Sequence, residues 1–289
     1  MKSTTQISSL AACVSLAVAA PAAADIHIDA TGHGGREGPS AVVARAVAKA
    51  ATLGGRSRQG LPVLAQVAKG HRSVVVTATL VPRCENGAGF ATVAFARAIV
   101  AKTGRFSVTK SVTTRFDDGY SVSERYKLIG KVTKAGARGS YRVDDTWFDP
   151  NGQKDDTCHT GTVGFRVSDA GVFAGTMNDG SPVVLQVSPG VDRVNSLLIP
   201  WTAECRSGGW MWDTADVSGP ITAEGTFAGT LNPTLDLGEG RLARETQMLG
   251  GMVTESLVRG TWRVQASITD STEAEIDACD TGPLTFKLF

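Results

Sequence analysis

The stretch Arg138-Gly139-Ser140-Tyr141-Arg142-Val143 recurs 121 positions later as Arg259-Gly260-Thr261-Trp262-Arg263-Val264. Polar and apolar residues alternate in both copies, which is typical of a β-strand with one buried face. Outward from this stretch, the same shift reveals further identities on both sides. They pair Gly104, Phe106, Leu128, Gly130, Val132, Thr133, Thr160, Gly161 and Phe165 with Gly225, Phe227, Leu249, Gly251, Val253, Thr254, Thr281, Gly282 and Phe286. The sequence therefore predicts a tandem duplication.

The cysteines follow the same duplication. Cys84 and Cys158 map onto Cys205 and Cys279 at the shift of 121, with no gap between them. Four cysteines allow three pairings. The duplication selects Cys84–Cys158 and Cys205–Cys279, because any other pairing would link the two copies. We therefore predict one disulfide in each copy and no zinc site, since no paired histidines accompany the cysteines.

Residues 1–24 have the pattern of a secretory signal peptide. Lys2 provides a short basic region, and Leu10–Ala20 is apolar but too short to span a bilayer. The small residues Ala22-Ala23-Ala24 offer a cleavage site before Asp25. Cleavage there would remove Cys13 with the signal and leave four cysteines in an exported chain, where disulfides are expected.

The segment after this cleavage site, residues 25–50, is predicted to be flexible, with a short helix over Ser40–Thr52. Cleavage after Ala24 would place His27 third in the mature chain, behind Asp25. The free amine, two backbone amides and this imidazole offer four nitrogens in a square plane, which suits Cu(II) or Ni(II). Asp25 and His27 are thus the candidate metal-ligating residues, and no cofactor is otherwise expected.

Apolar residues alternate with period two through both copies. In the first copy Tyr141, Val143 and Trp147 share one parity, and glycine, proline and Asx residues separate such runs at short intervals. Many short strands with frequent turns are typical of an antiparallel β-sandwich. The sequence therefore predicts an all-β fold of two tandem β-sandwich domains, over residues 51–168 and 171–289.

Upstream of the cysteines the repeat continues at a shift of 120, so the second copy must hold one inserted residue before Cys205. Positions that both copies retain are most simply explained by the fold. Among them, Arg142 and Arg263 lie between apolar strand residues, and we expect them to pair across strands with Glu124 and Glu245.

Two Gly-centred motifs carry a resemblance to known proteins. They are Gly171-Val172-Phe173-Ala174-Gly175-Thr176 and the closing Cys279-Asp280-Thr281-Gly282, which Phe286 follows. Together they resemble secreted β-sandwich repeats that are common in high-GC Gram-positive bacteria. The likeness covers nearly all of the second copy and a more divergent first copy, where Ala51-Thr52-Leu53-Gly54-Gly55 replaces the opening motif. It implies a fold, but no activity and no catalytic residue.

Composition narrows the function classes. The formal net charge is +1, from 29 Lys+Arg against 28 Asp+Glu, so we expect no general basic field for nucleic acid or an anionic membrane. Beyond the signal, no apolar stretch is long enough for a membrane helix. No GxSxG, HExxH or phosphate-binding loop occurs, so we nominate no catalytic residue and favour a non-enzymatic role.

Trp210 and Trp212 are the candidate ligand-binding residues. They are present in the second copy alone, since Gly89 and Ala91 occupy the matching places in the first. An extended segment puts both indoles on one side, where flat rings stack on sugars. The alternative is that both rings fill the core or the seam between the domains.

The sequence favours an exported binding or interaction protein at the cell surface or outside the cell, with glycan or cell-surface material as ligand. One alternative is an extracellular hydrolase that acts on a polysaccharide or peptide polymer. Another is a purely structural component of the cell envelope.

Overall fold

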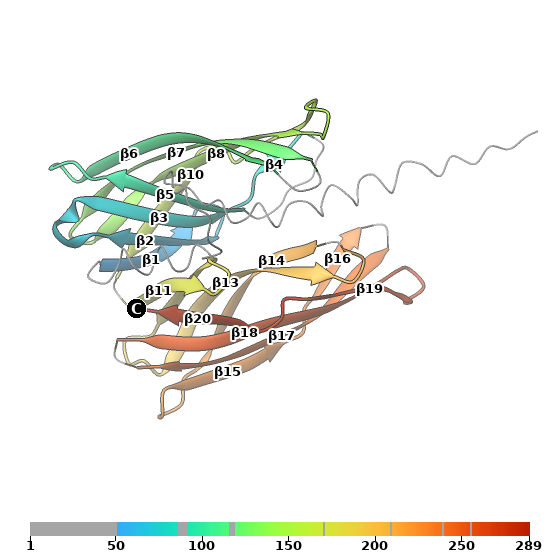
Figure 1. Ribbon diagram of the computed structural model, residues 1–289. Helices are drawn as coiled ribbons and strands as arrows, with labels where there is room; N and C mark the ends of the chain where they lie inside the picture. Colours follow the sequence, from blue (N-terminus) through green and yellow to red (C-terminus); the bar gives the residue numbers. More distant parts are fainter. Residues whose placement is uncertain are drawn as a thin grey trace, which may run out of the picture.

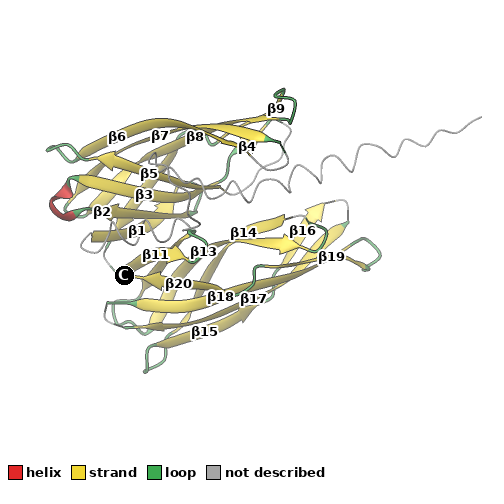
Figure 2. Cartoon of the chain, viewed as in Figure 1, coloured by secondary structure: helices red, strands yellow, loops and turns green. Residues whose placement is uncertain are grey.

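The computed structural model describes residues 51–85, 92–115, 119–169, 171–208, 210–238, 240–254 and 256–289. In these ranges nearly all regular structure is strand (Figure 2), and the one helical element is a 3-10 turn at Lys69–His71. None of the described helices is long and apolar enough to cross a membrane. The predicted signal peptide lies outside the described residues, as does most of the predicted helix. Its last two residues, Ala51 and Thr52, are strand instead, because they pair with Val67 and Gln66 of the next strand.

The first half of the chain forms a ten-stranded antiparallel sheet, which we call the first sandwich. Its strands are β1 (Ala51–Ser57), β2 (Pro62–Val67), β3 (Ser73–Leu80), β4 (Arg83–Cys84), β5 (Thr92–Ile99), β6 (Arg105–Arg115), β7 (Ser121–Thr133), β8 (Gly136–Phe148), β9 (Lys154–His159) and β10 (Val163–Ser168).

These strands follow the spatial order β6-β7-β8-β10-β1-β2-β3-β5, and a bridge between Val100 and Phe106 brings the two ends together. The sheet therefore folds back on itself, so that β6, β7 and β8 lie over β1, β2, β3 and β5 (Figure 1). Along one edge β8 pairs first with β10 and then with β9, which in turn pairs with β4. This fork extends the sandwich at one end.

The second half repeats the arrangement in a second sheet, the second sandwich. Its strands are β11 (Val172–Met177), β12 (Pro182–Val187), β13 (Arg193–Cys205), β14 (Trp210–Pro220), β15 (Thr226–Leu231), β16 (Thr234–Gly238), β17 (Arg241–Val253), β18 (Val258–Thr269), β19 (Glu275–Asp280) and β20 (Leu284–Leu288). The order β14-β13-β12-β11-β20-β18-β17-β15 is that of the first sandwich strand for strand. The predicted all-β fold in two similar halves is confirmed.

The residue inserted in the second copy lies at a β-bulge. Val67 pairs with Val74 and Gln66 with Val75 in the first sandwich. In the second, Val187 pairs with Val194, but Gln186 pairs with Ser196, and the register shifts between them. Asn195 is therefore the extra residue. A β-bulge accommodates the extra residue without moving the side chains of the rest of the strand to the opposite face of the sheet.

Repeated residues build the same core feature in both sandwiches. Phe106, Gly130, Gly139 and Phe165 stand directly opposite one another on β6, β7, β8 and β10. Both phenylalanines are buried, and each ring lies so close to a glycine that a Cβ there would clash with it. The glycines are thus required for ring packing, which explains why the duplication kept them. The second sandwich has the same row in Phe227, Gly251, Gly260 and Phe286.

The predicted disulfides are both present. Cys84 is bonded to Cys158 and Cys205 to Cys279, each pair 74 positions apart in sequence. The partners of each pair are also directly opposite in the sheet. Each disulfide therefore ties its extension of paired strands to its own sandwich.

The two sandwiches touch through matching faces. Leu64 of β2 is buried in a small cluster with Ala174 and Val184, which belong to β11 and β12. At Gly54 of β1, an added Cβ would lie 2.7 Å from the Cβ of Ala174. Since β1 and β2 correspond to β11 and β12, equivalent faces pack against each other. Only a residue without a side chain fits at Gly54 in this contact.

Candidate functional site

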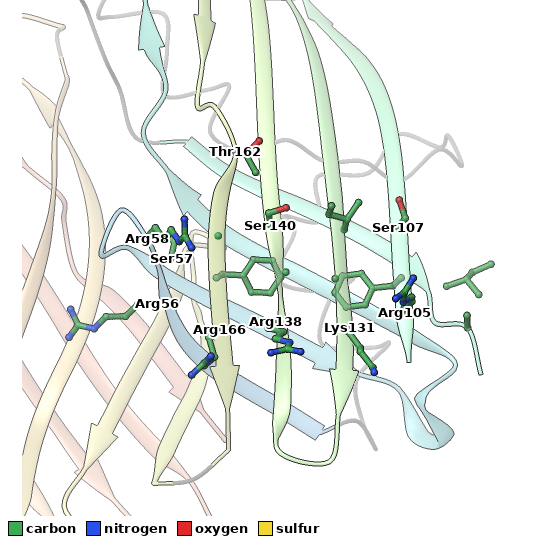
Figure 3. A pocket seen from close by; sticks show the side chains of 18 residues that line it. Arg56, Ser57, Arg58, Arg105, Ser107, Lys131, Arg138, Ser140, Thr162 and Arg166 are labelled. Carbon is green, nitrogen blue, oxygen red and sulfur yellow. The ribbon is translucent and has the colours of Figure 1, made fainter. Parts of the chain in front are cut away.

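Five basic residues stand opposite one another across five adjacent strands of the first sandwich. Arg105 of β6 pairs with Lys131 of β7, and Lys131 pairs with Arg138 of β8. Arg138 pairs with Arg166 of β10, and Arg166 pairs with Arg56 of β1. All five side chains are exposed, and Figure 3 shows them following one another from strand to strand. We call this set the basic row.

Strand alternation places the basic row on the outer surface. The neighbours of its members along the chain include Phe106, Val132, Ala137 and Val167, all of which are buried. Because successive side chains in a strand point to opposite faces, the row residues point outwards. The basic row thus lies on the outer face of the sheet, directly beside these buried core residues along the chain.

Such a row costs stability unless something negative covers it. Neighbouring strands are about 4.8 Å apart, and like charges directly opposite each other repel. Across the described ranges, Arg105, Lys131, Arg138 and Arg166 form no ion pair, whereas Arg56 contacts Asp216 of the second sandwich. Among the described residues, therefore, no carboxylate neutralises these four adjacent cations, which face solvent.

The row lines an open hollow of about 1100 Å³. The lining also includes Arg58 and the hydroxyl-bearing Ser107, Ser140 and Thr162 (Figure 3), and none of its described residues is acidic. Ile99, which is 83% exposed, also lines it. The hollow thus offers positive charge and hydroxyl groups, with an apolar side chain at one end. These groups are suited to hold an anion by ion pairs and hydrogen bonds.

The second sandwich has a hollow at the equivalent place, but its chemistry differs. It measures about 680 Å³. The positions that match the basic row hold two cations among uncharged residues. In strand order these residues are Thr226, Met252, Arg259, Lys287 and Thr176. Since the fold tolerates this set, it does not require the five cations of the first sandwich.

Buried carboxylates form a second unusual feature of the first sandwich. Glu124 of β7 lies opposite Asp145 of β8, and the two residues are only 4% and 2% exposed. Burial raises the pKa of Glu124 to about 8, and repulsion from Asp145 adds to the rise. Burial also raises the pKa of Asp145 to about 7, with a contribution from Asp144. One oxygen of each carboxyl has no hydrogen-bond partner.

The second sandwich has only half of this pair. Glu245 matches Glu124 and is also buried, but it stands opposite Ala266. Gln247 donates a hydrogen bond from Nε2 to Oε2 of Glu245. Burial raises the pKa of Glu245 as well, although the bond from Gln247 opposes the rise. The paired acid is therefore a property of the first sandwich.

The predicted pairing of Arg142 and Arg263 with Glu124 and Glu245 is wrong. Arg142 donates to Asp144, two residues along the same strand, and Arg263 donates to Asp280. The glutamates share the parity of Val122 and Leu128, which points into the core, whereas the arginines point out. Their side chains lie on opposite faces of the sheet and cannot meet.

The predicted tryptophan platform lies elsewhere. Trp210 and Trp212 are both in β14, which pairs with β13. Trp212 is half-buried and follows Met211, which belongs to the core. The side chain of Trp210 is outside the described residues. Trp212 lines neither the basic hollow nor its counterpart, so its role as a ligand-binding residue stays a prediction.

Neither predicted metal ligand can be placed, because Asp25 and His27 lie outside the described residues. In the described part, Cys84, Asp156 and Cys158 come together, as do Cys205, Asp277 and Cys279. Their cysteines are disulfide-bonded, and a metal binds the thiolate. These clusters therefore do not make metal sites.

No known protein family, curated protein or solved structure matches this chain. The duplication therefore supplies the internal comparison that relatives would otherwise give. By that measure, Arg56, Arg105 and Lys131 separate the basic hollow from its less charged counterpart, where Thr176, Thr226 and Met252 occupy the matching places.

Proposed function

We propose that this protein is an extracytoplasmic binding protein whose basic row holds a linear anionic polymer of the cell surface. The observation that carries the proposal is the row itself. It places five cations on consecutive strands, four of them without an acidic partner in the described chain. A covering polyanion would turn the repulsion between these side chains into a gain on binding.

The arrangement favours a linear ligand that crosses the strands. The row spans four strand-to-strand steps, which is roughly 19 Å at the usual spacing. A sugar polymer with one charged group on each unit presents its anions at a spacing comparable to the distance between neighbouring strands. The hydroxyls of Ser107, Ser140 and Thr162 beside the row are available to the sugar hydroxyl groups.

An anionic glycan fits the hollow better than a nucleic acid does. Proteins that hold single-stranded nucleic acid combine basic residues with exposed aromatic rings on which the bases stack. Here the aromatic residues in the lining, Phe106 and Phe165, are buried beneath the strands. The exposed apolar residues there are aliphatic, Ile99 and Ile129.

The two disulfides support an extracytoplasmic location, because such bonds persist in oxidising compartments. The predicted signal peptide points the same way. Polymers with a carboxylate or a phosphodiester on each unit both occur at cell surfaces and share the required chemistry. The experiment must therefore separate the two sources of charge.

The test compares charge reversal at equivalent places in the two sandwiches. Immobilised polygalacturonate and poly(glycerol phosphate) serve as the carboxylate and phosphodiester probes, with an uncharged glucan as blank. We expect wild-type protein to bind at least one of the two probes. Arg138→Glu/Arg166→Glu should weaken that binding at least about tenfold, because two ion pairs become repulsions.

The matched control is Arg259→Glu/Lys287→Glu, which makes the same change of charge at the equivalent positions of the second sandwich. It should retain wild-type affinity within about twofold. Equal losses in both variants would mean that net charge, not the basic row, governs binding. No binding of wild-type protein to either polymer would overturn the proposed function.

A further inference from the structure

The basic row ends at a contact with the other sandwich. Arg56 donates from Nη2 to Oδ2 of Asp216, at 2.8 Å, and to Oγ of Ser196, at 2.5 Å. Ser196 donates in turn to Oδ1 of Asp216, at 2.6 Å. In Figure 3 the Arg56 side chain points away from the other row members, toward the strands of the second sandwich. The fifth cation is therefore already engaged.

The engaging carboxylate has no counterpart in the first sandwich. Asp216 lies on β14, between the buried Ala215 and Val217, so its side chain points outwards. The duplication matches it with Phe95, and it matches Arg56 with Thr176. The ion pair thus joins two residues that are each particular to one copy.

This pair is exposed and hence replaceable. The side chains of Arg56 and Asp216 are 43% and 48% exposed, and exposed pairs are individually weak. However, Asp216 is tethered beside Arg56 by the contact between the sandwiches, which gives it a high effective concentration there. One further unit of a bound polymer therefore gains little binding free energy by displacing Asp216 from Arg56.

We infer that Asp216 is a specificity-determining residue. It neutralises Arg56, the fifth cation of the basic row, and so leaves four consecutive cations of the row for the ligand. The basic row then offers Arg105, Lys131, Arg138 and Arg166 to the ligand, and the second sandwich closes the row at β1. This inference rests on the proposed function and adds to it a defined length of ligand. Asp216 occupies the place that a fifth anion of the polymer would take.

The test measures affinity for oligogalacturonates of two to eight units, by titration calorimetry at low salt. With wild-type protein we expect affinity to rise about threefold for each added unit up to four, and then to level off. Asp216→Asn should move the end of the rise from four units to five. Arg56→Gln should cancel this gain in the Asp216→Asn background, so that the double variant again levels off at four units.

Ser196→Ala is the control for the contact between the sandwiches. It removes both hydrogen bonds of the Ser196 hydroxyl but keeps the carboxylate of Asp216, so the rise should still end at four units. A wild-type rise that continues through five units, together with a tenfold loss on Arg56→Gln, would overturn the inference and leave the proposed function intact. If no oligomer or polymer binds wild-type protein, the proposed function itself fails.

Discussion

Raising the pH from 5 to 9 should lower the melting temperature of the first sandwich by about 10 °C. The cause is the buried pair Glu124 and Asp145, whose pKa values are raised to about 8 and about 7. In the unfolded chain these groups lose their protons near pH 4. The folded chain keeps these protons up to pH values of about 7 and about 8. Unfolding therefore releases protons at any pH between about 4 and these values. Stability is therefore greatest below about pH 4, falls as the pH rises, and reaches its lower limit once the pH has passed 7 to 8.

Neutral replacements identify the source of this pH dependence. Glu124→Gln/Asp145→Asn should flatten the decline of melting temperature with pH, followed by calorimetry. Hydrogen exchange of the β7 and β8 amides would assign the transition to the first sandwich. Glu245→Gln is the control in the second sandwich and should leave the exchange of β7 and β8 unchanged. A wild-type melting temperature that is constant or higher at pH 9 would contradict the assignment.

Removing the Cys84–Cys158 disulfide should reduce the free energy of unfolding by about 4 kcal/mol on the chain-entropy estimate. The bond joins two residues that are 74 positions apart in sequence. Without it the unfolded chain gains conformational entropy, and this gain grows with the length of the loop. Since Cys205–Cys279 closes a loop of the same length, its removal should cost a similar amount. Paired Cys→Ala variants measured by urea denaturation check both values.

The location of each loss is as informative as its size. Each disulfide joins residues of its own sandwich, so Cys84→Ala/Cys158→Ala should speed hydrogen exchange in β8 and β9 and leave β18 and β19 protected. Loss of protection in both sandwiches from one pair of substitutions would show that the two halves unfold as a single unit. The separate role of each bond would then be wrong.

The repeated residues explain why so much of the fold is predictable from the sequence. Positions such as Gly130 and Gly251 survive in both copies because a phenylalanine ring occupies the space that a Cβ would need. The cysteine pairing follows from the same duplication, and so does the inserted residue that appears as the bulge at Asn195. Each of these features depends on spacing along the chain, which the sequence records directly.

The basic row is not visible in this way. Arg56, Arg105 and Arg166 are far apart in sequence, and only strand register aligns them. The near-zero net charge also hides the row, because acidic residues elsewhere on the chain balance it. The sequence signal for the row is that the cations at 56, 105 and 131 correspond to Thr176, Thr226 and Met252 in the second copy.

The buried glutamates were missed for a different reason. Glu124 lies between Val122 and Tyr126 at the inward parity, so alternation alone predicts that its side chain points into the core. The expectation of a surface ion pair between Glu124 and Arg142 conflicts with this alternation. It follows the general rule that carboxylates are rarely buried. The structure shows that alternation prevails and that the raised pKa is its consequence.

The most direct test of the basic row is an NMR titration of the isotope-labelled protein with tetragalacturonate. We predict that the amide and side-chain resonances that shift lie on β6, β7, β8 and β10, around Lys131 and Arg138. Shifts centred on β14 around Trp212, or on Arg259 and Lys287 of the second sandwich, would contradict this account.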